Sequence, residues 1–294
     1  MTTVLDRPAV ELFAPAKVNL YLHVTGRRED GYHLLDSLVV FAGTGDTLRF
    51  APSDRLSLSL EGPGAKHLAA TPDDDNIVLK AANRLAEALG RPAHAAITLE
   101  KHLPVAAGIG GGSADAAATL RGLLALWDAE LDEAALKEIG LKLGADLPVC
   151  LAGRPTQMSG IGETLTPAIA LPPAWLVLVN PRLALSTPAV FKARRGDFTP
   201  AAPLTGPIPD AHALAEALKT RRNDLADPAI ALEPVVPAML DAIAATEGCL
   251  LSRMSGSGAT CFGLYADEDS ADDAADSLRE SHPNWWISPA PILS

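Results

Sequence analysis

The sequence predicts a two-domain α+β protein, and three observations carry this prediction. The chain has 294 residues, of which 48% are hydrophobic, so it can bury a large core and exceeds the usual length of a single domain. Its first half mixes strands and helices around a glycine-rich segment. Its second half is predicted as strand, helices, hairpin, helix and strand, an order that favours an antiparallel sheet with helices on one side. We place the boundary in LAGRPTQMSGIGE (151–163), which gives domains at 1–155 and 156–294.

Hydrophobic periodicity predicts the elements of the first half. In KVNLYLHV (17–24) every second residue is apolar, and the opposite face of this strand carries Lys17, Asn19, Tyr21 and His23. Further strands are expected at SLVVF (37–41) and TLRF (47–50), joined by a turn at GTGD (43–46), and at AAITLEK (95–101). Helices are expected at DDDNIVLKAANRLAEAL (73–89), from near Ser113 to Trp127, and at LDEAALKEIGLKLG (131–144), which Gly144 would cap.

The second half follows from the same signals. WLVLVNP (175–181) is a buried strand, and STPAVFKARR (186–195) is a helix with Thr187 as its N-cap. An ordered surface loop is expected at 199–210, helices at 211–221 and 234–246, a hairpin at CLLSRMSGSGATCFGLYA (249–266), an acidic helix at DSADDAADSLRES (269–281) and a last strand at WWIS (285–288).

Charge and composition exclude several classes of protein. The net charge of −12 disfavours nucleic acid or an anionic membrane as a partner, and no apolar run reaches the length of a membrane span. MTTVLDRPAVELFAPAK (1–17) lacks the pattern of a secretory signal. Cys150, Cys249 and Cys261 form no CxxC pair, which argues against disulfides or a zinc site. We therefore expect a cytoplasmic protein, a monomer or weak homodimer, that attracts any phosphate ligand through a few local donors.

The segment HLPVAAGIGGGSADAAATL (102–120) predicts a phosphate site. Gly108 and Gly110–Gly112 stand between a strand and a helix, where the first helical amides lack partners and the helix dipole is positive. Glycines let several amides face one anion without an obstructing Cβ. A flexible linker or tight turn is the simpler alternative. A Walker A loop is disfavoured because no lysine follows Gly112, and a dinucleotide fingerprint is disfavoured by the spacing to Ser113.

Three segments resemble the signature motifs of the GHMP kinases. They are PAKVNLYLHVTGRREDGYHLLDSL (15–38), LPVAAGIGGGSADAAATL (103–120) and MSGSGATCFGLY (254–265), and the resemblance extends from about Ala14 to Tyr265. It implies an N-terminal domain like ribosomal protein S5 domain 2 and a ferredoxin-like C-terminal domain. It also implies phosphorylation by Mg²⁺-ATP of the 2-hydroxyl of diphosphocytidyl-methylerythritol, in the non-mevalonate route to isoprenoids.

The resemblance also implies roles for individual residues. Asp146 in GADLP matches the aspartate that accepts the hydroxyl proton, and Lys17 matches its partner. Tyr32 and His33 match substrate-binding residues, with Tyr32 stacked on the cytosine and His33 bonded to its edge. Asn19 shares the face of the strand that bears Lys17, so we expect it to bond to the substrate or to Asp146. ATP would be bound by Pro104, Val105, Ala106, Ala107, Gly108, Ile109, Gly110, Gly111, Gly112, Ser113 and Ala114.

Other residues matched by the resemblance would surround this site. Ser113 could cap its helix and touch phosphate or Mg²⁺, while Asp115 is not expected to bind the metal. No other metal ligand is expected, and the remaining histidines lack metal spacing. Lys101 and Asn76-Ile77 would border the adenine, Gly256, Ser257 and Gly258 would support the glycine loop, and Ser186 and Thr187 would approach the diphosphocytidyl end.

One departure from the family pattern has a structural consequence. Family members often carry glycine where this chain has Ala106 and Ala107, and alanine would be strained there if the backbone needed a positive φ.

Three alternative functions remain open. Another GHMP kinase, such as a homoserine or mevalonate kinase, is disfavoured by Gly31-Tyr32-His33. A non-catalytic nucleotide-binding protein is disfavoured because both Asp146 and Lys17 are retained, and a dinucleotide-binding oxidoreductase by the loop spacing.

Overall fold

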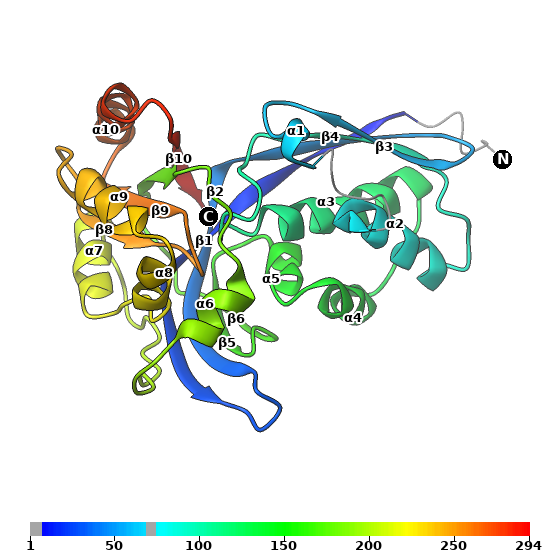
Figure 1. The fold of residues 1–294 in the computed structure, drawn as a ribbon. Helices are drawn as coiled ribbons and strands as arrows, with labels where there is room; N and C mark the ends of the chain where they lie inside the picture. The colour runs from blue at the N-terminus through cyan, green and yellow to red at the C-terminus, as the bar shows by residue number, and fades with distance from the viewer. Residues whose placement is uncertain (1–7, 69–74) are drawn as a thin grey trace. The chain divides into compact units, whose positions relative to one another are not determined.

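The computed structural model describes residues 8–68 and 75–294 and divides into two compact units (Figure 1). The first unit consists of three segments, of which only the described residues are meant: the segment that ends at Ala16, Gly45–Val105 and Gly110–Ala152. The second holds Lys17–Thr44, Ala106–Ile109 and Gly153–Ser294. Two long strands, β1 (Val10–Arg27) and β2 (His33–Ala51), supply residues to both units. The contiguous domain boundary at residues 155 and 156 stays a prediction.

The first unit combines a small sheet with helices. The end of β2 pairs antiparallel with β4 (Ala95–Glu100), and β4 pairs parallel with β3 (Leu56–Glu61). The helices are α1 (Ala65–Leu68), α2 (Ile77–Ala88), α3 (Gly111–Trp127), α4 (Glu133–Leu143) and α5 (Leu147–Ala152). Figure 1 shows α2–α5 gathered on one face of this sheet, where Leu85, Leu99 and Leu120 are fully buried. Burial of these aliphatic side chains stabilises the layer.

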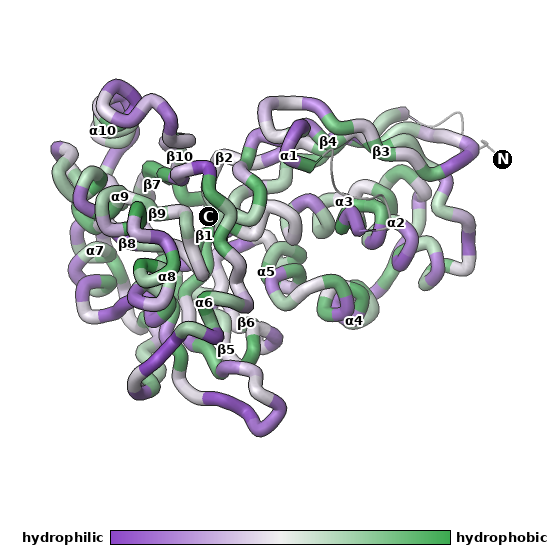
Figure 2. The backbone as a smooth tube through the Cα atoms, viewed as in Figure 1, coloured by the Kyte–Doolittle hydropathy of each residue, from purple (hydrophilic) through white to green (hydrophobic). Residues whose placement is uncertain are grey.

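The second unit contains the predicted antiparallel sheet, in the order β10-β7-β9-β8. The strands are β7 (Trp175–Asn180), β8 (Leu251–Met254), β9 (Cys261–Tyr265) and β10 (Trp286–Leu293), and β5 (Thr156–Gly160) pairs with β2 and with β6 (Thr164–Pro167). The helices are α6 (Thr187–Ala193), α7 (Ala211–Lys219), α8 (Ala226–Leu232), α9 (Val235–Ala244) and α10 (Glu268–Ser281). Figure 2 shows the hydrophobic character of β7, whose Val177 and Val179 share one core with α9 and α10.

The structure corrects the turn expected at GTGD (43–46), because β2 runs through it as one strand. Close backbone packing explains these glycines. A Cβ on Gly45 would lie 2.3 Å from the carbonyl oxygen of Ala14, and one on Gly43 would lie 2.9 Å from the ring of Pro291. The glycines therefore allow neighbouring atoms to approach a strand that stays extended. They do not form a turn that reverses the strand's direction.

The two expected side-chain N-caps are also wrong. The helix expected near Ser113 begins at Gly111, with Gly110 as its N-cap in the left-handed region. In α6 the N-cap position is occupied by Ser186 rather than Thr187, and its side chain makes no capping hydrogen bond. Gly144 does end α4. Asn76 caps α2, so the helix expected at 73–89 starts later; Asp73 and Asp74 lie outside the described residues.

The structure confirms four further predictions: the hairpin, the acidic helix, the last strand and the 199–210 loop. It also contains short elements that the sequence did not predict: β3, β5, β6, α1, α5 and α8. No disulfide joins Cys150, Cys249 and Cys261, all of which lie in the described ranges. Within residues 8–68 and 75–294, the helices are too short or too polar to cross a bilayer.

Candidate active site

The glycine-rich segment has left-handed backbone at three positions. Ala106 has φ 52°, Gly108 φ 75° and Gly110 φ 63°. Glycine adopts this region without penalty, whereas Ala106 bears the steric cost that its Cβ imposes, about 1–2 kcal/mol. Of the two alanines in this segment, Ala106 is therefore the strained one. The carbonyl oxygen of Ala106 accepts a hydrogen bond from the Leu185 amide, 3.5 Å away, which helps to hold this conformation.

Gly108 packs directly on the Gly/Ser turn of the hairpin, Ser255–Gly258. A Cβ on Gly108 would lie 2.4 Å from the carbonyl oxygen of Gly258, and a Cβ on Gly256 would lie 2.7 Å from the carbonyl oxygen of Gly108. The Thr260 amide also donates to the carbonyl of Ala107, at 3.2 Å. The predicted support of the glycine loop by Gly256 and Gly258 therefore exists as a contact between two backbones. Ser257 instead contacts Thr187, with 2.7 Å between the two hydroxyl oxygens.

Lys17 and Asn19 lie beside this part of the loop. The Lys17 amide donates to the carbonyl of Ile109 at 2.9 Å, and the Lys17 ammonium donates to Asn19 Oδ1 at 2.9 Å. The Asn19 amide donates to Ser255 Oγ at 3.1 Å, and Asn19 Nδ2 donates to Ser37 Oγ at 2.8 Å. Only 3% of Lys17 and 1% of Asn19 is exposed, so this face of β1 is buried. A buried lysine held by an amide oxygen is oriented rather than free to swing.

Asp146 belongs to the first unit, immediately before α5. It is half-buried, and its carbonyl accepts from the Cys150 amide at 3.2 Å, which continues the helical bonding of α5 back to Asp146. The Leu147 amide donates to the carbonyl of Gly144, also at 3.2 Å. The main chain of Asp146 is therefore fixed between α4 and α5, and the side-chain carboxylate extends from this fixed position.

A buried ion cluster holds the start of α3. Lys101 Nζ lies 2.5 Å from Asp46 Oδ2 and 2.8 Å from Asp115 Oδ2. Asp46 Oδ1 also accepts from the amides of His102 and Leu103, at 2.6 and 2.9 Å. The cluster ties β2, the exit of β4 and the first turns of α3 together. Lys101 therefore pairs with two carboxylates, and the Asp115 carboxylate pairs with Lys101.

The ion cluster also changes how its members bind protons. Burial raises the pKa of Asp115 to about 7. The positive charge of Lys101 lowers this pKa, and the negative charge of Asp46 raises it further. For Lys101, burial alone would lower the pKa, but the two carboxylates outweigh it and the pKa is raised. One ammonium faces two carboxylates, so a proton on Asp115 reduces the net buried charge.

Tyr32 and His33 lie at the start of β2. The turn before them closes by hydrogen bonds between Arg28 and Tyr32 and between Gly31 and Arg28. The Tyr32 side chain is 62% exposed, whereas the His33 ring stacks on Phe191 of α6, with 5.1 Å between ring centroids. Burial, then the charges of Arg27 and Arg194, lower the pKa of His33. An exposed phenol therefore stands next to a neutral imidazole.

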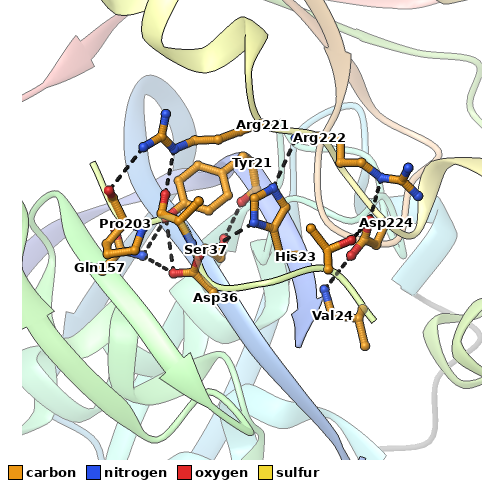
Figure 3. Close-up of polar contacts among 12 residues, drawn as sticks. Tyr21, His23, Val24, Asp36, Ser37, Gln157, Pro203, Arg221, Arg222 and Asp224 are labelled. Carbon is orange, nitrogen blue, oxygen red and sulfur yellow. Dashed lines mark hydrogen bonds and ion pairs between the residues drawn. The ribbon is translucent and has the colours of Figure 1, made fainter. Parts of the chain in front are cut away.

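A further buried network lies on the same face of β1, beyond Asn19 (Figure 3). Tyr21 OH donates to Asp36 Oδ1 at 3.2 Å, and Gln157 Nε2 donates to both of these oxygens. His23 Nε2 accepts from the Arg222 amide at 3.2 Å, which requires an unprotonated Nε2, and burial lowers the pKa of His23 accordingly. These contacts explain why the polar face of this strand can be buried.

The structure adds residues that the sequence analysis did not single out: Ser37, Asp46, Phe191 and Ser255. All four stand inside quoted segments, but their roles depend on partners that are distant in sequence, such as the Asn19 side chain for Ser37 and the Asn19 amide for Ser255. Asn76 caps α2 through a 2.9 Å bond from the Val78 amide to Asn76 Oδ1, so its position needs no ligand to explain it. The described residues contain no cluster of three or more His, Cys, Asp or Glu side chains suited to a metal.

Comparison with known proteins defines the class of enzyme. The model of the GHMP kinases N terminal domain matches residues 76–154, and that of the GHMP kinases C terminal matches residues 208–284. The structure is also similar to a crystal structure of L. major mevalonate kinase, with a TM-score of 0.66 over 96% of this chain and 95% of that one, at 14% identity. That likeness shows the fold alone. The chain is a GHMP kinase.

Relatives of higher identity narrow the assignment. The chain is 64% identical over 96% of its length to the 4-diphosphocytidyl-2-C-methyl-D-erythritol kinase of Paramagnetospirillum magneticum, covering 98% of it. It is 60% identical over 94% of its length to that of Rhodospirillum rubrum, covering 90% of it. A crystal structure of 4-(cytidine 5'-diphospho)-2C-methyl-D-erythritol kinase matches with a TM-score of 0.78 and 38% identity, over 97% of this chain and 100% of that one. The chain therefore belongs to the 4-diphosphocytidyl-2-C-methyl-D-erythritol kinases.

The raised pKa of Asp115 predicts a pH effect on stability. Because the folded state binds this proton more tightly than the unfolded state, the contribution of Asp115 to the free energy of unfolding falls as the pH rises from about 4 to about 7. Asp115→Asn removes this titration. Urea unfolding measures the free energy of unfolding of both proteins at pH 5 and pH 8. The value for the wild type minus that for the variant should be larger at pH 5 than at pH 8. A difference that stays constant or grows with pH would contradict the assignment. Glu130→Gln is the control for loss of one exposed negative charge in the same unit.

Proposed function

We propose that this chain transfers the γ-phosphoryl group of ATP to the 2-hydroxyl of 4-diphosphocytidyl-2-C-methyl-D-erythritol. The observation that carries the proposal is the 64% identity, over nearly the whole chain, with an enzyme whose name states this substrate. The reaction places it in the non-mevalonate route to isopentenyl diphosphate. A cytoplasmic location, a monomer or weak homodimer and the absence of nucleic-acid partners stay predictions.

ATP binding is assigned to residues 104–114. The first amides of α3 have no acceptor within the helix, and the left-handed Gly110 precedes them. Together with the helix dipole, these amides suit the triphosphate of a nucleotide. The assignment does not need a lysine, which agrees with the commitment of Lys101 to Asp46 and Asp115.

Lys17 and Asp146 are assigned to the transfer itself. Phosphoryl transfer requires alignment and charge stabilisation more than covalent chemistry. Asp146 accepts the proton of the 2-hydroxyl, and Lys17 stabilises the charge that develops on the oxygens. The bond from Lys17 Nζ to Asn19 Oδ1 supports this role, because it fixes the direction of the ammonium group. Asn19 orients Lys17 and bonds to the substrate.

A magnesium ion is compatible with the residues at the start of α3. Ser113 is half-buried in the first turn and offers a hydroxyl, whereas the Asp115 carboxylate is held by Lys101. This donor set suits an ion bound mainly through phosphate oxygens, with Ser113 as the protein ligand. When bound, Mg²⁺ neutralises phosphate charge.

The cytidine end of the substrate is assigned to Tyr32 and His33. Tyr32 presents an exposed ring for stacking on the base. Phe191 holds the His33 ring, and the lowered pKa of His33 keeps it neutral, so it offers one donor and one acceptor to the edge of cytosine. Ser186 and Thr187, at the start of α6, are assigned to the diphosphate end.

The role of Asp146 predicts a kinetic defect without a binding defect. Asp146→Ala should lower kcat by about 10²- to 10⁴-fold, the usual contribution of a general base, while ATP still binds. Release of ADP and calorimetric titration with ATP measure the two effects. Asp132→Asn, which removes an exposed charge but preserves the cap of α4, is the matched control. Near-normal turnover of the Asp146 variant would refute the assignment.

The role of Tyr32 predicts selective loss of substrate affinity. Tyr32→Ala should raise KM for the diphosphocytidyl substrate about tenfold, because a base-stacking surface is lost, and leave KM for ATP unchanged. Phe198→Ala removes another exposed aromatic ring of the same unit and serves as the control. Equal changes in both KM values would show that the pyrimidine is bound elsewhere.

A further inference from the structure

Asn223, in the segment between α7 and α8, makes three hydrogen bonds with its buried side chain. Nδ2 donates to the carbonyls of Met254 and Gly256, each at 2.8 Å. Oδ1 accepts from the Leu225 amide at 2.9 Å. Only 6% of the residue is exposed. Both donors and the acceptor of the carboxamide are therefore used, and the two donors hold the entrance and the middle of the turn Ser255–Gly258.

The segment that carries Asn223 is itself fixed to β1. The Leu22 amide donates to the carbonyl of Arg222 at 3.0 Å, and the Asp224 amide donates to the carbonyl of Leu22 at 2.8 Å. These bonds form a parallel bridge between Leu22 and Asn223. The strand that bears Lys17 and Asn19 thus also provides the platform from which Asn223 reaches the turn.

The turn passes this constraint to the glycine-rich segment. Gly256 and Gly258 contact Gly108 so closely that a Cβ at Gly108 or Gly256 would meet a facing carbonyl oxygen within 2.7 Å. Ser255 Oγ accepts from the Asn19 amide and lies 3.5 Å from the carbonyl of Gly108, to which it donates. A displacement of the turn therefore displaces Gly108, because neither backbone has a side chain that could adjust.

We propose that Asn223 is a positioning residue for phosphoryl transfer, which sets the backbone of Ala106–Ile109 by holding the turn Ser255–Gly258. The inference rests on the proposed function, in which this segment binds ATP. Asn223 acts through the turn and touches neither substrate. Its loss should weaken the binding of ATP more than the binding of the diphosphocytidyl substrate, because the cytidine end is assigned to Tyr32 and His33, outside the turn.

Asn223→Asp tests the inference with little change in size. The aspartate can still accept from Leu225, but its second oxygen faces two carbonyl oxygens in place of the amide donor. Calorimetry at pH 8 should show the dissociation constant for ATP raised about tenfold or more, the effect expected for two lost donors and an unfavourable buried contact. KM for the diphosphocytidyl substrate should rise by a smaller factor than the dissociation constant for ATP.

The pH profile of Asn223→Asp supplies a signature that general destabilisation would not give. Burial and the adjacent carbonyls raise the pKa of a carboxyl group in this position, and its protonated form can again donate to one carbonyl. The gap in ATP affinity between variant and wild type should therefore narrow from pH 8 to pH 6. Asn223→Ser, which is neutral and removes the repulsion, should weaken ATP binding at both pH values and covers the case that the aspartate variant does not fold.

Thr246→Val is the matched control. It removes a hydroxyl of the same unit that donates to the carbonyl of Ile243 at 2.7 Å and lies 2.6 Å from Tyr265 OH, away from the turn. It should lower Tm and leave the affinity for ATP unchanged. ATP affinity unaltered in both Asn223 variants, or equal losses for ATP and the diphosphocytidyl substrate, would overturn the inference. Absence of turnover in the wild type would instead refute the proposed function, and the calorimetric comparison would still decide the role of Asn223.

Discussion

The geometry of the candidate active site depends on a contact between two backbones that leaves no room for side chains. Gly108 meets Gly256 and Gly258 where a Cβ would collide with a carbonyl oxygen. This contact fixes Ala106–Ile109 against the hairpin of the second unit, and the bond from the Lys17 amide to Ile109 fixes it against β1. Gly108 therefore has a structural contact with the turn in addition to its proposed place in the ATP-binding segment.

The buried lysines of this acidic chain are each paired with nearby oxygen atoms. The net charge is −12, yet Lys17 and Lys101 are both buried and both held by oxygen atoms. Lys101 pairs with two buried carboxylates, Asp46 of β2 and Asp115 of α3, and so reduces their charge. Lys17 donates to the side-chain oxygen of Asn19, which orients its ammonium group.

The sequence predicted most elements and all the motif segments, because both arise from local patterns. The alternation at 17–24 and the glycines before α3 needed no knowledge of the fold. The predictions that were wrong concerned features that depend on residues distant in sequence. GTGD has the composition of a turn, but Ala14 and Pro291 make its glycines part of a strand. The resemblance placed Gly256 and Gly258 beside the glycine loop, but the bonds from Asn223 to Met254 and Gly256 join two segments that no local pattern connects.

The most direct test of this account is a crystal structure of the protein with a non-hydrolysable ATP analogue. The account predicts that the triphosphate lies against the amides at the start of α3. It also predicts that Gly108 stays in contact with Gly256 and Gly258, with the Ala107 carbonyl bonded to the Thr260 amide. A nucleotide bound elsewhere, or a loop that leaves the turn Ser255–Gly258 when the nucleotide binds, would contradict it.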